Sequence, residues 1–275
     1  MQKISLIDET FDLNYTSEYI LSIQVSLDGF SFSILNTAQN KVVYLCHQDI
    51  FATEPDFQYK KLKSIYKESD LLELPYKKTR LYFSIPEKTT LVPVKLFKTD
   101  TATELYGLTF GLDKQTEVQS RYLPCLDAFA VFGIQKSILG ILQEKHPGIE
   151  IQNAIKLSAC FANDDKQTLK VSVLRKHLMI LSVHTGLHYY NCFYHENEND
   201  MLFYILAAAK SLDEEPSTII MDGMVNKHSE IYHRLRQYFA DVQIAGSNKN
   251  IGYSHLIERL PDARFVNLFN SFSCE

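Results

Sequence analysis

Four histidines in the second half of the chain have the side chains that a zinc site would need. His184 and His188 flank a predicted hairpin turn, so their imidazoles could approach each other, and His177 or His195 could add a further ligand. The same strands carry no carboxylate or thiol at ligand spacing. We therefore interpret the four histidines as half-exposed strand residues and predict no metal site.

An acidic stretch offers oxygen ligands of the kind that calcium prefers. Glu196, Glu198 and Asp200 alternate with Asn197 and Asn199, but this order does not complete an EF-hand loop. Acidic residues at the start of a helix also interact favourably with the helix dipole. We interpret the stretch as the entry to a helix.

Nucleophilic chemistry is not indicated by any motif in the sequence. Gly-x-Ser-x-Gly, His-Glu-x-x-His and Walker sequences are all missing. The cysteines are odd in number, widely scattered and without a C-x-x-C pair: Cys46, Cys125, Cys160, Cys192 and Cys274. Such usage favours a reducing cytoplasm over a zinc knuckle or a disulfide framework. We predict no catalytic residue and no cofactor.

Charge and hydropathy argue against nucleic acid and membranes as partners. The chain has 28 Lys and Arg residues and 33 Asp and Glu residues, which gives a net charge of −5. The basic residues form no stripe along the sequence. Two basic runs, 59–63 and 76–80, have aromatic neighbours, but a helix face and a loop explain them. No run of eighteen apolar residues occurs, and residues 1–19 lack the pattern of a signal peptide. We expect a soluble cytoplasmic protein without membrane insertion; its oligomeric state is left open.

An antiparallel meander is predicted near the start of the chain. Polar and apolar residues alternate over 21–25, 30–34 and 41–46, and Leu27-Asp28-Gly29 supplies a hairpin turn. The elements predicted after the meander are a helix at 56–69, a strand at 80–85, a helix at 101–110, strands at 117–123 and 128–132, and a helix at 134–145.

Residues 91–111 interrupt this order, and Pro93 argues against a central strand there. We interpret them as an insertion on the first half. His146-Pro147-Gly148 terminates the last helix, so the two halves are predicted to meet near 147–165. The predicted organisation is a first half over 1–150 and a second half over 151–275.

The second half repeats the order of the first. Its predicted elements are strands at 168–175, 177–183 and 187–194, a helix at 200–212, a strand at 218–222, a helix at 227–239 and a strand at 242–245. The meander that begins near Leu21 thus recurs near Leu169, as a duplication of architecture without sequence identity. From the apolar phase of the strands we predict eight core residues: Ile23, Val25, Phe32, Ile34, Val171, Val173, Ile180 and Ile220.

Three antiparallel strands followed by alternating helices and strands, twice in tandem, resemble the ribonuclease H-like fold as doubled in actin, sugar kinases, the 70-kDa heat-shock chaperones and the pilus assembly ATPases. Four parts of the chain carry a second resemblance: Phe-Ser-Ile-Pro-Glu-Lys-Thr-Thr-Leu-Val-Pro at 83–93, Phe97, the second meander, and Leu-Pro-Asp-Ala-Arg-Phe-Val-Asn-Leu-Phe at 260–269. They resemble an uncharacterised Bacteroidetes family, domain of unknown function 3822. The resemblance implies an α/β actin-like fold, with a mixed five-stranded sheet flanked by helices in each half, and a Bacteroidetes origin. It brings no known activity.

The resemblance also implies where a nucleotide would bind, because actin-like ATPases hold magnesium-nucleotide between the halves with an Asp-x-Gly-Thr/Ser turn in each. The matching register at 24–26 lacks both the Asp and the Gly, and the nearest candidate is the displaced pair Asp28-Gly29. The second turn carries Arg175 and Lys176, which could meet an anion or form an exposed hairpin tip. Asp222-Gly223 resembles the adenine-side turn with one glycine where the ATPases usually have two.

Two functions remain open at this point. The first is a non-catalytic actin-like binding or scaffold protein with a degenerate nucleotide cleft and an unidentified protein partner. Phe265, Phe269 and Phe272 could be anchors for that partner or could complete the core. The alternative is an unconventional ATP-binding enzyme or switch that uses Asp28, Gly29, Asp222 and Gly223. A ribonuclease H-type nuclease is disfavoured, since the first strand carries Gln24 and serines in place of carboxylates.

Overall fold

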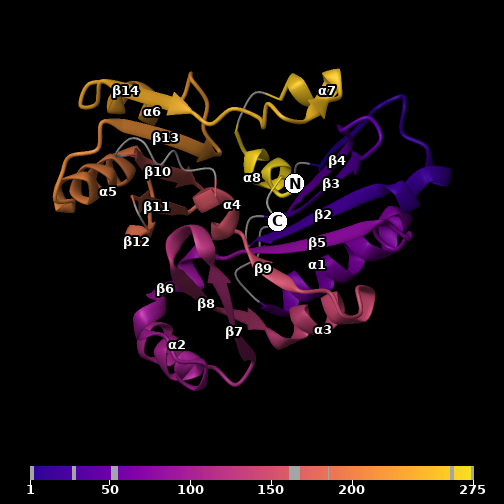
Figure 1. Ribbon diagram of the computed structural model, residues 1–275, viewed down its shortest axis with the longest axis horizontal. Helices are drawn as coiled ribbons and strands as arrows, with labels where there is room; N and C mark the ends of the chain where they lie inside the picture. Colours follow the sequence, from indigo (N-terminus) through magenta and orange to yellow (C-terminus); the bar gives the residue numbers. More distant parts are fainter. Residues whose placement is uncertain are drawn as a thin grey trace.

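A computed structural model describes residues 3–26, 29–50, 55–160, 168–184, 186–260 and 263–273, with the side chains of 55 and 56 left out. Asp28 and Cys274 therefore lie outside the described residues. The chain forms two large sheets, one in each half, and a smaller third sheet beside the first (Figure 1). This mixed α/β architecture is the predicted fold class.

The first sheet is built on the predicted meander. Strands β2 (Tyr19–Ser26), β3 (Gly29–Asn36) and β4 (Lys41–Asp49) pair antiparallel. Strand β5 (Lys78–Ser84) then pairs parallel with β2, and β9 (Ile151–Asn153) pairs parallel with β5. The predicted division at residue 150 thus falls directly before a strand of the first sheet.

Two further strands make the first sheet seven-stranded, where the prediction was five. Strand β1 (Lys3–Ile7) pairs antiparallel with β4, and β15 (Gly252–Tyr253) pairs parallel with it at Lys41 and Val42. An uncovered strand edge presents unpaired backbone groups, and these two segments cover the edge of β4. A segment as short as β15 has no periodicity of its own, so the sequence did not reveal it.

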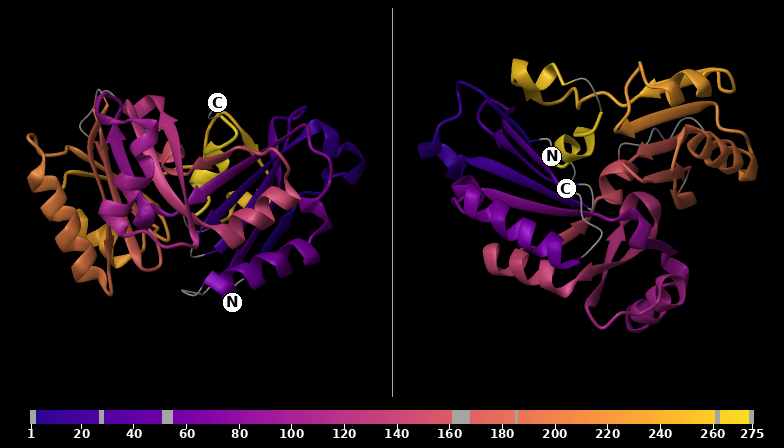
Figure 2. Two further views of the ribbon diagram at one scale, coloured as in Figure 1. Left: turned by 90° about the horizontal axis from the view of Figure 1, so that it is seen from below. Right: turned by 180° about the vertical axis from the view of Figure 1, so that it is seen from behind.

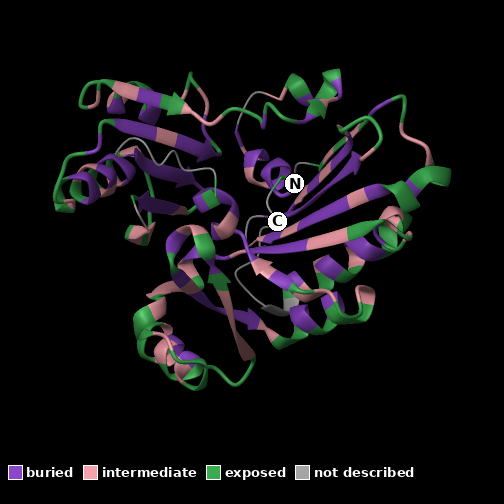
Figure 3. Ribbon diagram, in the orientation of Figure 1, coloured by how far each residue is buried: buried purple, intermediate pink, exposed green. Residues whose placement is uncertain are grey.

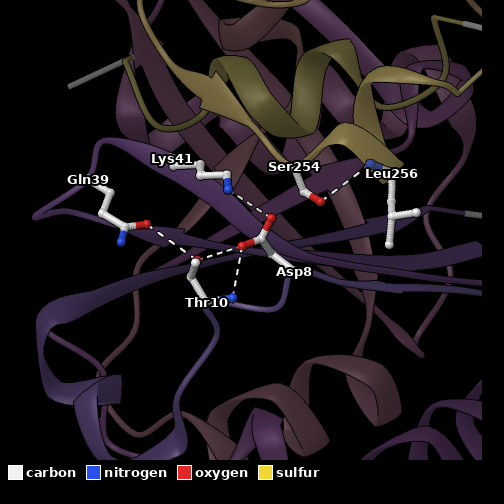
Figure 4. Close-up of polar contacts among 6 residues, drawn as sticks. All are labelled: Asp8, Thr10, Gln39, Lys41, Ser254 and Leu256. Atoms are coloured by element: carbon white, nitrogen blue, oxygen red, sulfur yellow. Dashed lines mark hydrogen bonds and ion pairs between the residues drawn. The ribbon is translucent and has the colours of Figure 1, made fainter.

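An ion pair between a buried carboxylate and a half-buried lysine holds these additions together. Asp8, directly after β1, lies 2.8 Å from Lys41 Nζ through Oδ2, and its Oδ1 accepts hydrogen bonds from the backbone N–H and the hydroxyl of Thr10 (Figure 4). Ser254 lies beside the pair and accepts a 3.4 Å hydrogen bond from the Leu256 N–H. The start of the chain, β4 and the segment after β15 therefore meet at one polar cluster.

Helices cover both faces of the first sheet. On one face lie α1 (Pro55–Glu68) and α3 (Lys136–Lys145); on the other lie α7 (His255–Glu258) and α8 (Val266–Asn270) (Figure 2). Helix α3 begins two residues later than predicted because the preceding strand continues through Gln135. The chain thus returns from the second half to complete the first; we call residues 263–273 the C-terminal return.

The smaller sheet has the order β6-β8-β7, with strands β6 (Thr89–Pro93), β7 (Thr116–Leu123) and β8 (Ala128–Gln135). Helix α2 (Ala102–Phe110) packs on it. Pro93 ends β6, which is an edge strand, where a missing N–H is tolerated. The predicted insertion at 91–111 lies in this unit, which in the structure extends to Gln135.

The second sheet repeats the order of the first, as β12-β11-β10-β13-β14 against β4-β3-β2-β5-β9. Its strands are β10 (Thr168–Val173), β11 (His177–Val183), β12 (Leu187–Tyr194), β13 (Thr218–Gly223) and β14 (Asp241–Ile244). Helices α5 (Glu198–Ser211) and α6 (Glu230–Leu235) pack on one face. The first three strands are antiparallel and the others are parallel, as in the first half.

The two second-half helices differ from prediction at their ends. Helix α5 starts at Glu198, because Asn197 and Asp200 form a capping box before it, so the acidic stretch is indeed a helix entry. Helix α6 is much shorter than the predicted 227–239. Ser229 and Asn226 hydrogen-bond to each other in a turn before it, and its C-terminal end tightens into i+3 bonds.

Seven of the eight predicted core residues are buried, and Ile220 is the exception. Ile219 and Met221 point into the core of the second half, so the alternation of β13 is one position out of phase with the prediction. Most strand residues of both large sheets are buried (Figure 3). None of the helices in the described part of the chain is long and apolar enough to cross a membrane.

The remaining short elements connect the sheets. Helix α4 (Ile155–Cys160) follows β9 on the way to the second half. The 3-10 helices are η1 (Leu13–Glu18), η2 (Asp70–Leu72), η3 (Pro86–Lys88), η4 (Val94–Leu96), η5 (Thr99–Thr101) and η6 (Pro124–Leu126).

Candidate functional site

The candidate site is the cleft between the halves, where β2, β5, β10 and β13 end. Two small cavities of about 40 and 60 Å³ lie in this cleft. A water molecule occupies roughly 30 Å³, and ligand pockets usually measure about 300–1,000 Å³. Each cavity therefore has room for one or two waters. At the strand ends the cleft is narrowed by the protein's own side chains, among them Gln24, Leu174, Met179, Arg264 and Asn267. A larger cavity of about 380 Å³ lies beside the first one and is lined by Lys170, Asp222 and Asn267.

The C-terminal return contributes directly to this narrowing. Arg264 lines both cavities, and Ala263 forms an antiparallel bridge with Gly223 at the end of β13. The Gly223 N–H donates a 3.4 Å hydrogen bond to the Ala263 carbonyl, and the Met224 N–H donates a 2.7 Å bond to the Val173 carbonyl. The backbone N–H groups of the turn that resembles an adenine-side loop are thus bonded to carbonyls of the same chain.

Gly223 is a glycine for reasons of packing. Its φ is +87°, and a Cβ at this position would lie 2.2 Å from the Val173 carbonyl oxygen. L side chains rarely adopt that backbone conformation. The close approach of β10 and the turn therefore accounts for Gly223 without a bound nucleotide.

Asp222, the acidic partner in the same turn, is buried. Burial raises the pKa of Asp222, while the neighbouring Ser172 hydroxyl and the charge of Lys170 oppose the rise. Asn267 of the C-terminal return donates a 3.3 Å hydrogen bond to Asp222 Oδ2. A carboxylate engaged in this way is poorly placed to orient a magnesium ion and its water shell.

Lys170 lies on the same face of the second sheet as Asp222, because it precedes Ser172 by two positions and Ser172 pairs with Asp222. Its Nζ donates a hydrogen bond to the Ser158 carbonyl of α4. Burial lowers the pKa of Lys170, and the Asp222 charge opposes that change. The sheet face toward α4 and α8 is therefore polar.

In the first half, Asp28 lies outside the described residues, but its neighbour Gly29 begins β3. The Ser26 hydroxyl accepts a 3.1 Å hydrogen bond from the Gly29 N–H and donates a 3.0 Å bond to its carbonyl. A Cβ on Gly29 would lie 2.7 Å from His47 Cε1. Close packing against His47 is again enough to require a glycine.

A buried Ser-His-Asp chain lines the same cleft. Ser31 Oγ lies 2.8 Å from His47 Nδ1, and His47 Nε2 lies 3.0 Å from Asp49 Oδ1. All three residues line the 60 Å³ cavity, and the imidazole contacts the ring of Phe265 edge-on at 5.3 Å. Such a chain can pass protons in a hydrolase, but this cavity is too small for a substrate beside the hydroxyl.

Sequence reasoning missed this chain because its members lie on two strands, 16 positions apart. Ser31 pairs directly with His47 in the β3–β4 register, and Asp49 follows two positions later on the same side. The meander was predicted, but the pairing register of its second and third strands was not. That register places the three residues side by side. The imidazole and the carboxylate at His47 and Asp49, on the strand next to Ser31, are the signal that could have found the chain.

The second-half turn separates its two basic residues. Arg175 lines the 60 Å³ cavity, whereas Lys176 Nζ lies 5.8 Å from the centre of the Tyr194 ring. Both residues are exposed, as the predicted hairpin tip requires, and the predicted anion contact stays a prediction. Of the two, Arg175 is the one that faces the cleft.

The four histidines do not converge. His177 packs edge-on against Tyr194, His195 Nε2 lies 3.1 Å from the Leu174 carbonyl, and His188 Nε2 lies 3.9 Å from Asp213 Oδ2. Among the residues that the structure describes, no three His, Cys, Asp or Glu side chains are placed to hold a metal ion.

The C-terminal phenylalanines complete the core. Phe265, Phe269 and Phe272 are buried in a cluster with Leu35 and Leu45 of the first sheet. Of the two roles left open for them, packing is the one that the structure supports.

The architecture is similar to that of two solved structures. A Bacteroides thetaiotaomicron VPI-5482 protein with an actin-like ATPase fold and unknown function aligns with a TM-score of 0.81 at 21% identity, over 97% of this chain and 100% of that one. A chain of the PilM–PilN type IV pilus biogenesis complex aligns with a TM-score of 0.60 at 8% identity, over 93% and 98% of the two chains. At these identities the likeness concerns the fold, which is actin-like.

Sequence comparison gives the family. Among curated proteins, none matches this chain. The model of one family matches residues 8–242, which include both meanders and most of the second half. The chain therefore belongs to the family described as protein of unknown function (DUF3822).

Proposed function

We propose that this protein is a non-catalytic actin-like binding or scaffold protein that acts through a protein partner. The observation that carries the proposal is the small size of the cavities at the strand ends. Arg264 and its neighbours in the C-terminal return line the two cavities of about 40 and 60 Å³ where the strands of both sheets end. Neither of these two cavities has room for a nucleoside triphosphate.

The chemistry of the cleft supports the same proposal. A bound triphosphate needs converging backbone donors and an acidic residue that orients the metal's water shell. The second-half turn presents Arg175, and Asp222 is hydrogen-bonded to Asn267. The carboxylates in the described part of this cleft, Asp49 and Asp222, both already have partners inside the protein.

The exposed surface of the smaller sheet supports a protein partner. Leu96, Leu108 and Leu112 are 60–79% exposed, and all three belong to the unit that interrupts the first half. Exposed large apolar side chains are candidates for contacts with a partner. The similar PilM–PilN structure is itself a protein–protein complex.

Calorimetric titration with Mg-ATP, together with an assay of phosphate release, tests the proposal. We expect no binding tighter than about 1 mM, which corresponds to roughly 4 kcal/mol, and no phosphate release. Micromolar binding that Asp28→Ala abolishes, while the exposed-site control Asp100→Ala preserves it, would contradict the scaffold function.

The second candidate is an unconventional ATP-binding enzyme or switch that uses Asp28, Gly29, Asp222 and Gly223. One observation favours it: Arg175 and Arg264 both line the 60 Å³ cavity, so an anion entering an opened cleft would meet two guanidinium groups. Opening would require Arg264 to move. The same titration separates the two functions.

A further inference from the structure

Two cysteines that are distant in sequence meet at the joint between the halves. Cys125 and Cys160 are 35 positions apart, and their Sγ atoms lie 2.8 Å from each other. Cys125 is the middle residue of η6, the tight connection between β7 and β8, and Cys160 is the last residue of α4. Helix α4 packs directly on η6.

The surroundings of this pair favour thiol chemistry. Cys160 is exposed and Cys125 is half-buried, so a small oxidant can reach the pair. The Lys170 ammonium is close enough to interact electrostatically with both sulfurs. A nearby positive charge stabilises a thiolate, which is the reactive form of cysteine.

The other described cysteines are in a different environment. Burial raises the pKa of the Cys46 thiol and, more strongly, that of Cys192. Both thiols therefore stay protonated and react slowly. They provide internal controls in the same molecule.

We propose that Cys125 and Cys160 form a reversible dithiol–disulfide site, with glutathione disulfide or a related low-molecular-weight disulfide as the oxidant. A disulfide bond is about 2.05 Å long, so the sulfurs need to approach by less than about 1 Å. The pair is thus arranged for bond formation with small side-chain rotations.

The reaction balances as two thiol–disulfide exchanges. The Cys160 thiolate attacks one sulfur of glutathione disulfide and releases one glutathione thiolate, which leaves a mixed disulfide on Cys160. The Cys125 thiolate then attacks Cys160 Sγ and releases the second glutathione. The two protein thiols lose two protons and two electrons, and glutathione disulfide takes up the electrons.

Bond formation would fasten the joint between the halves. Helix α4 lies between β9 of the first sheet and the second half, and its Ser158 carbonyl accepts the hydrogen bond from Lys170 of β10. A covalent link from α4 to η6 would therefore tie the smaller sheet to the segment that also holds the second sheet. The oxidised protein should be the more rigid one at this joint.

The test uses the full chain with Cys274→Ser, so that the fifth thiol cannot compete. After incubation with excess glutathione disulfide, we expect a mass loss of two hydrogens and, on non-reducing digestion with trypsin, a cross-link between peptides 122–136 and 157–166. Dithiothreitol should restore the original mass. The thermal midpoint should rise on oxidation and return on reduction.

Three variants in this background complete the test. Cys160→Ser, at an exposed position, should fold normally and show neither the cross-link nor the rise in thermal midpoint. Cys125→Ser should retain a glutathione adduct on Cys160, and the matched control Cys192→Ser should still form the cross-link. A stable glutathione adduct on Cys160 with Cys125 intact, a cross-link to another cysteine, or no reaction at all would overturn the proposal.

Discussion

Asp8 keeps its negative charge almost out of contact with water, at the place where β1, β4 and the segment after β15 meet (Figure 4). Burial alone would raise the pKa of this carboxyl. The hydrogen bonds from Lys41 and Thr10 outweigh that effect and hold the pKa far below its ordinary value of 3.8. The folded state therefore stabilises the ionised form of Asp8 better than the unfolded chain does.

This difference makes the contribution of Asp8 depend on pH. A carboxyl whose pKa is lower in the folded state stabilises the protein fully above its unfolded pKa, and the contribution disappears as the pH falls through the folded pKa. We expect Asp8→Asn to lower the free energy of unfolding by about 1–3 kcal/mol at pH 7. The difference in free energy of unfolding between the natural protein and the variant should become smaller below about pH 4.

Urea denaturation of both proteins, at a series of pH values from about 3 to about 8, measures the effect. Asp12→Asn is the control, since Asp12 is half-buried, caps η1 and accepts its hydrogen bonds from Asn14, which is uncharged. If the difference in free energy of unfolding stays constant over the whole pH range, the charge of Asp8 does not contribute to stability.

At the scale of elements, the turn after β13 shows how one backbone position connects the second sheet to the C-terminal return. Gly223 has a left-handed φ and lies against Val173, and it bridges to Ala263. A side chain here would push the turn away from β10 and from the C-terminal return at once.

We therefore expect Gly223→Ala to lower the free energy of unfolding by more than about 2 kcal/mol, from the strained φ together with the steric clash. Gly246→Ala is the matched control, because a Cβ at Gly246 would have nothing within 4 Å. Thermal or urea unfolding of the two variants gives the comparison. Equal stabilities would show that the turn can move freely.

The strands of this protein could be predicted because most of them carry a local signal. Ile23, Val25, Phe32 and Ile34 alternate with polar residues, and all four are buried in the first half. The phase failed at Ile220 because Thr218–Gly223 contains three consecutive large apolar residues, and such a run is compatible with either phase. A strand as short as β15 has too few residues to show an alternation of polar and apolar side chains.

The site could be predicted less well than the fold because it depends on contacts between distant residues. The pairing of Ser31 with His47 needs the register of a hairpin, and the meeting of Cys125 with Cys160 needs the packing of η6 on α4. Neither contact corresponds to a characteristic spacing of residues in the sequence. The narrowing of the cleft by Arg264 depends on where the C-terminal return crosses the molecule, which periodicity does not encode.

At the scale of the whole molecule, the halves are joined twice. The chain passes from β9 through α4 to the second half, and the C-terminal return passes back over β2 and β3 of the first sheet. Polar contacts fix this return: Ser22 Oγ lies 2.5 Å from Ser271 Oγ, and Arg80 Nη1 donates a hydrogen bond to the Ser271 carbonyl. The second half therefore cannot be removed without uncovering the first.

Phe269 is the residue that tests this arrangement. It is 3% exposed and packs edge-on against Tyr253 at 5.2 Å between ring centres. We expect Phe269→Ala to lower the free energy of unfolding by about 3–5 kcal/mol, as for other large-to-small changes in a core. Phe203→Ala, at a site that is 66% exposed, should change it by less than about 0.5 kcal/mol.

Urea unfolding curves of the two variants, followed by circular dichroism, make the measurement. If Phe269→Ala lowers the free energy of unfolding no more than Phe203→Ala does, the C-terminal return is only loosely attached to the first sheet. A single transition in both proteins is the expected form of the curve, because the two halves share core residues.

The C-terminal return also sets the order of events during synthesis. A ribosome releases β2, β3 and β4 early, but the buried residues that pack on Leu35, Val42 and Leu45 come much later in the chain, in Ile251, Ile257 and the C-terminal return. The nascent first half therefore presents a bare apolar face for most of translation, when it is most exposed to aggregation and to chaperones. A chain released before Phe265 should accordingly keep α7 but lack α8 on that face, so that we expect it to aggregate more readily than the full chain.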